Sequence, residues 1–462
     1  MRMNLETIEK KIKEVIGDSL KYIAKPFIKN NFEIYLVGGI LRDIILGRSS
    51  SAFEYDLATN ATPEEVIKLF PHVIPTGIKH GTVTVIHRKI HYEITTFRAD
   101  GKYTDGRHPD AVSYSKTIDE DLKRRDFTIN AFAYNLKTYK FIDNFNGLSD
   151  IKDKIIRTIG NPDDRFQEDG LRLMRAIRFA AVLNFNINEK TFRSIIKNNF
   201  MLRKVSMERI RDEFVKIMTA EKPSIGLELL RKSEILRYIL PELMICYGVS
   251  QNKYHKYDVY YHILYTVDAA PADNLAVRLA ALFHDISKPF SKSVSPPSDE
   301  KESTFYNHEI ISSIVAKKVM KRMKFSNELI HKVEKLVKNH MFYYTEEWTD
   351  SAVRRFIRKV GLDLLDDLYL LRRADRIGNG TKSGESRHLE MLKKHIEKIL
   401  EEDNAFSVKD LKINGKDVMR IKNIPPSPKV GEILNYLLEV VLDNPEKNTP
   451  EILESLVSEY PD

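Results

Sequence analysis

The sequence predicts an α+β protein, in which a head with a small mixed sheet precedes a chain that is almost entirely helical. Two observations support this prediction. To about residue 150, short strand-like runs recur between turn residues, among them 35–37, 81–86 and 89–98. From Asp163 onward, apolar residues recur at helical spacing instead. With 462 residues, the chain is long enough for three or four domains, each with its own core.

The composition is that of a globular protein, with 42% hydrophobic and 30% charged residues. Lys and Arg outnumber Asp and Glu by 74 to 66, and the pI is near 9.0. This modest excess fits a polyanionic partner, although many basic proteins have none. The single cysteine, Cys246, excludes an internal disulfide, and no run approaches the roughly 18 to 20 apolar residues of a membrane span. We therefore expect a cytoplasmic protein without a membrane partner, and predict no protein partner.

The stretch from Tyr35 to Thr59 organises the head. Its apolar strand ends in Gly38-Gly39, where the absence of a Cβ lets backbone N–H groups approach a phosphate at the start of the next helix. Arg42, one turn later, can donate a forked pair of hydrogen bonds to the same phosphates. Glu54 and Asp56 share one face of the following strand, and such a carboxylate pair suits Mg²⁺ bound to a nucleotide.

Several local patterns define the rest of the head. Residues 4–30 have helical periodicity, and Thr62, Pro63 and Glu65 form a helix start with a capping box. Glu93, on the strand predicted at 89–98, is either a third carboxylate near the metals or an ordinary strand acid. Residues 99–112 are rich in Gly and Asp and predict a long loop.

Two charged patterns follow. The sequence RRDFTINA begins at Arg124 and is either a solvated helix face or part of a site. Farther on, Asp169, Arg172, Arg175 and Arg178 recur every third residue and predict one stripe along a single helix. Such a stripe is usually a salt-bridged exterior. However, a carboxylate beside a guanidinium can also read a base edge that offers an amine next to a ring acceptor, as C and A do.

Three of these motifs together carry a resemblance: LVGG-x-x-RD followed by an acid-x-Asp pair, RRDFTINA, and EDxxR at Glu168 to Arg172. They resemble the class II tRNA nucleotidyltransferases (CCA-adding enzymes) and bacterial poly(A) polymerases, whose head has a DNA polymerase beta-like fold. The resemblance implies that Glu54 and Asp56 are catalytic Mg²⁺ ligands, although the family normally has Asp where this chain has Glu54. It also implies a set of nucleotide-binding residues: Gly38, Gly39, Arg42, Arg124, Arg125, Asp126, Asn130, Asp169, Arg172, Arg175 and Arg178.

Within that set, the resemblance assigns different roles. Arg124 and Arg125 would serve the triphosphate, Asp126 and Asn130 would lie near the sugar, and Asp169 with Arg172 would select the incoming base. Residues 206–218 match a further family motif that supports the neck. The loop at 99–112 occupies the place of a family loop that assists the change from C to A, which argues against a strictly CC-adding enzyme. The basic residues of the tail either form a solvated surface or lie along the backbone of a structured RNA: Lys412, Lys416, Arg420 and Lys422.

A second set of residues has the order H…HD…H…H…D on predicted helices: His262, His284, Asp285, His308, His340 and Asp375. Imidazoles and carboxylates suit a divalent transition metal, and an open coordination position would give phosphohydrolase chemistry. This order resembles the HD phosphohydrolase superfamily. The resemblance implies an HD-type metal site at His262, His284, Asp285 and Asp375, although some relatives have lost the metal and keep the domain as a scaffold.

We therefore predict an enzyme that adds CCA to the 3′ end of tRNA from CTP and ATP by two-metal nucleotidyl transfer. One alternative is an A-adding tRNA nucleotidyltransferase or a poly(A) polymerase of the same fold. Another is an HD phosphohydrolase whose head only binds RNA. The predicted domains are a nucleotidyltransferase head (1–150), a helical neck (151–252), an HD-type domain (253–400) and a helical, tRNA-binding tail (401–462).

Overall fold

The computed structural model describes residues 5–48, 55–78, 81–99, 113–251, 255–293, 304–381, 383–401 and 405–461. The chain divides into two compact units, Met1–Pro241 and Glu242–Asp462. Two sequence predictions fall wholly or largely outside the described residues: Glu54 and the loop at 99–112. Among the helices of the described residues, none is long and apolar enough to cross a membrane.

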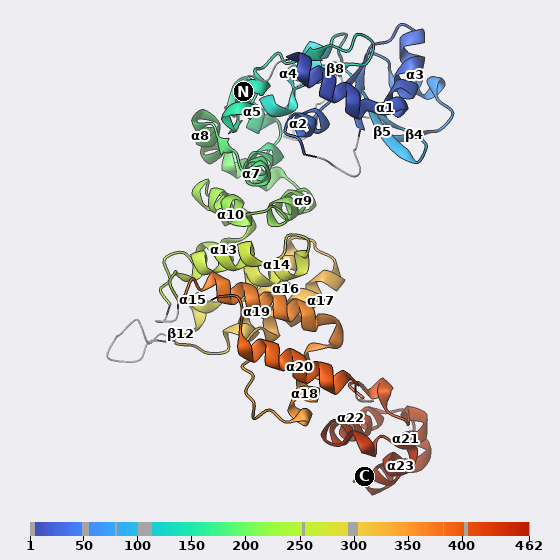
Figure 1. Cartoon of the computed structure of the whole chain (residues 1–462), viewed down its shortest axis with the longest axis vertical. Helices are drawn as coiled ribbons and strands as arrows, with labels where there is room; N and C mark the ends of the chain where they lie inside the picture. The colour runs from blue at the N-terminus through green and yellow to red at the C-terminus, as the bar shows by residue number, and fades with distance from the viewer. Residues whose placement is uncertain are drawn as a thin grey trace. The chain divides into compact units, whose positions relative to one another are not determined.

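The first unit contains a seven-stranded sheet in the order β3-β4-β5-β2-β1-β8-β9. Figure 1 labels β4, β5 and β8 of this sheet. Strands β2 and β5 run parallel and the other neighbours antiparallel, which confirms the predicted mixed sheet. All four residues of β1 are buried, in agreement with its uninterrupted apolar sequence. The strands are β1 Ile34–Val37, β2 Tyr55–Thr59, β3 Val73–Gly77, β4 Thr82–His87, β5 Ile90–Thr96, β8 Ala133–Asn135 and β9 Phe141–Ile142.

Four helices accompany this sheet: α1 Leu5–Lys29, α2 Gly39–Ile45, α3 Pro63–Leu69 and α4 Ile118–Lys123. Helix α1 buries Ile8, Ile12 and Leu20 at the predicted helical spacing. Thr62 and Glu65 form the predicted capping box of α3, with Pro63 at its first position. Local capping preferences therefore account for the start of α3, and the apolar spacing accounts for the buried face of α1.

After the sheet, the first unit is helical, apart from a small two-stranded pairing of β10 Ile155–Ile156 with β11 Asn186–Ile187. Its core consists of large side chains from several helices, among them Phe166, Ile177, Phe214 and Leu227. The helices are α5 Gly147–Asp153, α6 Pro162–Glu168, α7 Leu171–Leu183, α8 Glu189–Asn198, α9 Met207–Met218, α10 Pro223–Lys232 and α11 Leu236–Ile239.

The prediction that one helix carries the whole Asp169–Arg178 stripe is wrong. Helix α6 ends at Glu168, Asp169 has extended backbone angles, and α7 begins only after Gly170. A Cβ at Gly170 would lie 2.7 Å from the carbonyl oxygen of Met201, so the break brings two backbones close together. The Asp169 carboxylate accepts a hydrogen bond from the Leu171 N–H and stabilises the start of α7.

Nearly all the regular structure among the described residues of the second unit is helical, and β12 Lys292–Ser293 pairs antiparallel with β13 Thr304–Phe305. Its last helices form their own core around Val418, Leu437 and Leu453. The helices are α12 Pro241–Met244, α13 Val259–Ala269, α14 Leu275–Phe283, α15 Lys288–Ser291, α16 His308–Arg322, α17 Asn327–Asn339, α18 Asp350–Val360, α19 Leu365–Gly378, α20 Arg387–Glu401, α21 Gly415–Lys422, α22 Pro428–Asp443 and α23 Pro450–Glu459.

Candidate functional site

The turn between β1 and α2 places backbone against a carboxylate. Gly38 has a φ of 80°, in the left-handed region, and a Cβ there would lie 3.1 Å from Asp56 Oδ2. Only glycine allows both this conformation and this approach without strain. Strand β1 is paired with β2, which brings Asp56 beside the glycine turn. The predicted glycines and Asp56 are therefore neighbours in space.

A second carboxylate lies beside Asp56. Strands β2 and β5 are parallel, and their register pairs Asp56 with Glu93. Both side chains line the same cavity. The sequence left two alternatives open for Glu93, a third carboxylate near the metals or an ordinary strand acid. Its position beside Asp56 is the one expected of the third carboxylate. Glu54 lies outside the described residues.

A buried chain of polar contacts joins the first motif to the second and to α7. Arg42 Nη1 donates to Asn130 Oδ1 at 2.6 Å, and Asn130 Nδ2 donates to Asp126 Oδ1 at 3.2 Å. The other oxygen of Asp126 accepts a hydrogen bond from Arg175 Nε at 2.6 Å. Burial opposes the charged form of Asp126, but Arg175 and Arg172 outweigh it and lower its pKa to about 2. Asp126 is therefore an anion that holds Arg175 directly and, through Asn130, is linked to Arg42.

The two arginines of the RRD motif are held by an acid that sequence reasoning missed. Asp121, only 1% exposed, accepts from Arg124 Nη2 at 2.7 Å and from Arg125 Nη2 at 3.1 Å. Despite burial, these two cations lower the pKa of Asp121. The i, i+3 and i, i+4 spacing was the available signal. Because one carboxylate holds both side chains, their positions are fixed before any ligand binds.

The proposed base-selecting pair is also held by neighbours. Arg209 Nη2 of α9 donates to Asp169 Oδ2 at 2.9 Å, and Arg172 contacts Glu168 and donates from Nη2 to the Arg124 carbonyl oxygen at 3.1 Å. These contacts orient the Asp169 carboxylate, a hydrogen-bond acceptor, and the Arg172 guanidinium, a forked donor. Arg209 is a residue that sequence reasoning did not single out, although it lies inside the motif at residues 206–218.

Another acid of the same motif, Glu213, supports the end of the arginine stripe. Its Oε2 accepts from Arg178 Nε at 2.8 Å, and both side chains are buried or nearly so. The Arg178 guanidinium lies 3.5 Å from the centre of the Phe179 ring, and Arg42 lies 5.0 Å from the same ring. Both guanidinium groups therefore gain a cation–π contact with Phe179.

These side chains line one cavity of about 590 Å³ in the first unit. Eight arginines and four acids face it, an electropositive lining that suits a polyanion such as a triphosphate. Its size lies in the range of ordinary ligand sites. The structure brings together Asp56 and every nucleotide-binding residue that the sequence predicted: Gly38, Gly39, Arg42, Arg124, Arg125, Asp126, Asn130, Asp169, Arg172, Arg175 and Arg178.

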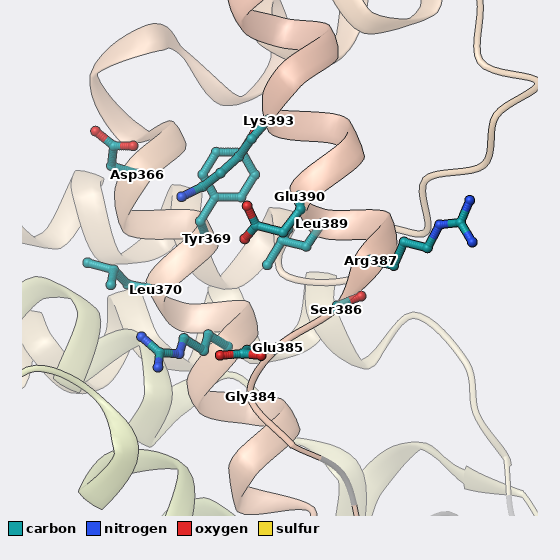
Figure 2. Close-up of a pocket in the computed structure, with 11 residues that line it drawn as sticks. Asp366, Tyr369, Leu370, Gly384, Glu385, Ser386, Arg387, Leu389, Glu390 and Lys393 are labelled. Atoms are coloured by element: carbon teal, nitrogen blue, oxygen red, sulfur yellow. The ribbon is translucent and has the colours of Figure 1, made fainter.

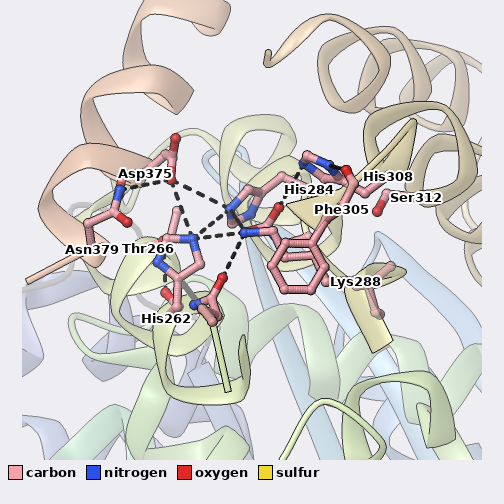
Figure 3. A network of polar contacts seen from close by, with 12 residues as sticks. His262, Thr266, His284, Lys288, Phe305, His308, Ser312, Asp375 and Asn379 are labelled. Atoms are coloured by element: carbon pink, nitrogen blue, oxygen red, sulfur yellow. Dashed lines mark hydrogen bonds and ion pairs between the residues drawn. The ribbon is translucent and has the colours of Figure 1, made fainter. Parts of the chain in front are cut away.

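The second unit holds a buried cluster of histidines and aspartates (Figure 3). His262 comes from α13, His284 and Asp285 follow α14, and Asp375 lies on α19. His262 Nε2 lies 3.0 Å from His284 Nε2, 3.0 Å from Asp285 Oδ2 and 3.3 Å from Asp375 Oδ1. The four residues predicted for an HD-type metal site therefore converge, with their ligand atoms in mutual contact.

Two further histidines complete this cluster on its other side. His308, at the start of α16, lies 3.2 Å from Asp285 Oδ1 through its Nε2. His340, which follows α17, lies 3.9 Å from the same oxygen. Burial lowers the pKa of His340 to about 3, so this imidazole is neutral, the form that binds metals. The cluster thus contains all six residues of the H…HD…H…H…D set.

The charged groups of the cluster shift one another's pKa values. Burial opposes ionisation of Asp285, but His284 and Lys288 hold its pKa well below the usual range. Hydrogen bonds to Asp285 and Asp375 overcome burial and raise the pKa of His262 to about 9. The cluster without metal therefore holds a proton that a metal ion would displace. A cavity of about 370 Å³ reaches this cluster and is also lined by Arg372 and Arg376.

A further cavity, of about 800 Å³, lies between α19 and α20 (Figure 2). Its acids Asp366, Glu385 and Glu390 are balanced by Arg373, Arg387 and Lys393. None of the predicted site residues lines this cavity, and its mixed charge indicates no particular ligand.

Comparison with known proteins identifies the family. The model for the poly A polymerase head domain matches residues 34–157, and one for tRNA nucleotidyltransferase domain 2 matches residues 306–457. A CCA-adding enzyme of Lactococcus lactis is 35% identical over 437 residues, which cover 93% of this chain and 94% of that relative. The chain belongs to the CCA-adding enzyme family. A Streptococcus thermophilus CCA-adding enzyme is 32% identical over 429 residues, with 92% of both chains covered.

A solved structure extends this family relationship to the fold. The crystal structure of the Bacillus stearothermophilus CCA-adding enzyme in complex with CTP has a TM-score of 0.69 and 26% identity, covering 97% of each chain. This likeness confirms the predicted polymerase beta-like head with a mixed sheet and a mostly helical body. Membership of the family also implies a divalent metal for nucleotidyl transfer. The HD-type domain and the residue roles remain predictions.

Proposed function

We propose that this protein adds CCA to the 3′ end of tRNA, using CTP and ATP and the cavity of the first unit. The full-length similarity to CCA-adding enzymes supports this activity. The observation that carries the site assignment is that Asp56 and Glu93 lie side by side in a cavity that eight arginines also line. Paired carboxylates together with many guanidinium groups suit a metal-bound nucleoside triphosphate.

The carboxylates of Asp56, Glu54 and Glu93 would hold the divalent metal, for which we propose Mg²⁺. Acidic oxygens on adjacent strands fit this ion, which prefers one or two carboxylates with phosphate oxygens and water. When bound, Mg²⁺ would lower the pKa of the RNA 3′-hydroxyl and counter charge on the departing pyrophosphate. The chain's own part is to set the carboxylates beside the Gly38 turn, where backbone can approach the phosphates.

Three arginines would bind the triphosphate. Arg124 and Arg125 are fixed by the buried Asp121, and Arg42 is fixed by Asn130. Because these side chains are ordered in advance, little side-chain freedom remains to be lost when the phosphates bind. Their charges would also stabilise the pyrophosphate as the bond to the α-phosphate breaks.

Base selection would rest on Asp169 and Arg172. Asp169 can accept a hydrogen bond from the exocyclic amine of C or A, while Arg172 donates to the adjacent ring acceptor. Arg209 and Glu168 hold the two side chains at the cavity. The same pair would serve an A-adding enzyme or a poly(A) polymerase of this fold, so the products must distinguish these alternatives.

The test is nucleotide incorporation into tRNA that lacks CCA or already ends in CC, followed by sequencing of the products. We expect CCA and A to be added, respectively, from mixed CTP and ATP. Asp56→Ala should abolish addition and leave tRNA binding nearly unchanged, whereas Asp164→Ala, at an exposed acid of α6, should retain activity. CTP incorporation by Asp56→Ala would contradict the metal assignment, and a product of A alone would favour the A-adding alternative.

We propose a second, metal-dependent activity for the cluster of the second unit: hydrolysis of phosphate esters. Its support is the convergence of His262, His284, Asp285 and Asp375, which fit a divalent transition metal. A phosphatase assay with added Mn²⁺, Co²⁺ or Ni²⁺ should show activity in the wild type and none in Asp285→Ala. Equal activity in both proteins, or none in either, would make this domain a scaffold. Hydrolysis without CTP incorporation would instead favour an enzyme whose head only binds RNA.

A further inference from the structure

We propose that Phe179 is a positioning residue for nucleoside triphosphates, because its ring holds three arginines of the first-unit cavity in place. This inference rests on the proposed nucleotide site and extends it to a residue outside the predicted set. Phe179 lies on α7, is only 3% exposed, and lines the cavity. It is therefore packed in the core and also reaches the ligand site.

Three guanidinium groups surround this one ring. The guanidinium carbon lies 3.5 Å from the ring centre in Arg178, 5.0 Å in Arg42 and 5.5 Å in Arg175. All three distances are within the roughly 6 Å over which an aromatic ring attracts a cation. Arg175 and Arg178 come from α7 itself, whereas Arg42 comes from α2. The edge of Phe127, in the RRDFTINA motif, also contacts the ring, with centroids 5.7 Å apart. One side chain thus joins all three nucleotide motifs.

The ring supplies an attraction that Arg178 needs. Burial lowers the pKa of Arg178, and Arg175 lowers it further, so the pull of Glu213 in the opposite direction is not enough to restore the usual value. The Arg178 side chain is only 12% exposed, and a cation–π contact is strongest where water is excluded. Phe179 therefore stabilises a charge that burial and a neighbouring cation oppose.

An aromatic ring holds an arginine without occupying its donors. A guanidinium carbon 3.5 Å from the ring centre leaves no room for an N–H group between them, so the two planes of Arg178 and Phe179 stack. The N–H groups of a guanidinium lie in its plane, so stacking leaves them directed outward. Among the described residues, the hydrogen bond of Arg178 to Glu213 uses Nε. Its two Nη groups therefore stay available to an anion in the cavity that Arg178 lines.

The arginines around Phe179 point to a role in affinity rather than in base selection. Arg42 is one of the arginines proposed for the triphosphate, which CTP and ATP have in common. Asp169 and Arg172, proposed for base selection, are held by Arg209 and Glu168 and make no contact with the Phe179 ring among the contacts of the described residues. Weakening the ring should therefore reduce the binding of CTP and ATP by the same factor.

The test replaces Phe179 with mono-, di- and trifluorinated phenylalanine in the full-length chain. Fluorine withdraws electron density from the ring face and weakens its attraction for cations, while the side chain stays apolar and nearly the same size. We expect the Kd of CTP, measured by equilibrium dialysis with Mg²⁺, to rise with each added fluorine, by about tenfold in total. The Kd of ATP should rise in parallel.

The matched control places the same fluorinated residues at Phe166 of α6. This ring is also fully buried in the first unit, and no cation lies over it in the part of the chain that the structure describes. Both Kd values should stay unchanged there, because fluorine in the core has no cation–π contact to weaken. A rise of the same size at Phe166 would overturn the inference, since it would show a general effect on packing.

The outcomes separate this inference from the activity on which it rests. Kd values that ignore fluorination at Phe179 would overturn the positioning role and leave the residue as part of the core. A rise for one nucleotide alone would also overturn it, because a role at the triphosphate requires both. A graded rise in a protein that adds no CCA would support the inference and contradict the proposed activity. Absence of CTP and ATP binding in the wild type would contradict both.

Discussion

Replacing Asp126 with asparagine should weaken the first unit in a way that depends on pH. The Asp126 carboxylate is buried, accepts from Arg175 at 2.6 Å and from the Phe127 N–H at 2.8 Å, and has a pKa of about 2. In an unfolded chain the pKa would be about 3.9. Because the folded value is the lower one, the stabilisation is complete well above pH 3.9 and is lost as the pH falls through 2.

The magnitude follows from the two pKa values. A difference of about 1.9 pH units corresponds to about 2.6 kcal/mol at pH 7, of which roughly half remains at pH 3. The amide that replaces the carboxylate would have no such dependence, since it does not titrate in this range. We therefore expect Asp126→Asn to unfold more easily at pH 7, by about 2 to 3 kcal/mol, and the difference from the wild type to shrink to about half by pH 3.

The assay is urea unfolding at pH 7, 5 and 3, followed by far-ultraviolet circular dichroism. The fluorescence of Trp348, the single tryptophan, reports the second unit, so a dichroism change without a fluorescence change belongs to the first. Asp164→Asn, at an exposed position of α6, is the matched control and should follow the wild type at every pH. A stability difference of the same size at pH 7 and pH 3 would refute the reasoning, as would no difference at pH 7.

Three further predictions concern single positions. Gly38→Ala should lower CTP incorporation roughly 100-fold, because its Cβ would press on the Asp56 carboxylate, the proposed metal ligand of β2. Gly47→Ala, at a position that also has a positive φ (68°) but lies in open space, should keep near-normal activity, and equal losses in both would contradict the steric argument. Arg209→Ala should lower discrimination of CTP over UTP about tenfold in single-turnover incorporation, since Asp169, which we propose for base selection, loses a charged hydrogen bond. Unchanged discrimination would remove this role. Gly378→Ala should destabilise the second unit by about 3 kcal/mol, because its Cβ would lie 2.1 Å from Thr266 Oγ1. The measurement is unfolding followed by Trp348 fluorescence. A stability equal to that of the wild type would show that α13 and α19 can separate without cost.

Much of the cavity could be predicted from sequence because its motifs are local. Gly38 and Arg42 lie within one strand–helix turn, and Arg124 to Asn130 lie within seven residues, so a short pattern places them near each other. Each predicted nucleotide-binding residue lines the cavity. The combination of paired glycines, arginines and paired acids is also typical of phosphate and metal binding, so the residue types indicated the class of ligand.

The partners that fix those residues were harder to predict. Arg209 reaches Asp169 across 40 positions, and Glu213 reaches Arg178 across 35. Such pairs depend on how α7 packs against α9, and no local periodicity encodes that packing. A failed prediction, the continuous helix through Asp169, has the same cause: the close approach of Met201 to Gly170 is a tertiary contact. The prediction that Asp285 and His340 lie on helices is also wrong, because they follow the ends of α14 and α17.

The sequence by itself determined the family motifs, the mixed sheet of the head and the residues predicted to line the cavity, because these depend on residue type and on contacts within a few positions. Only the tertiary structure decided which oxygen of Asp285 faces which histidines, and that Glu93 lies beside Asp56. Those arrangements arise where several helices, or two parallel strands, meet. Packing and strand register set the distances there, to within the few tenths of an ångström on which metal coordination depends.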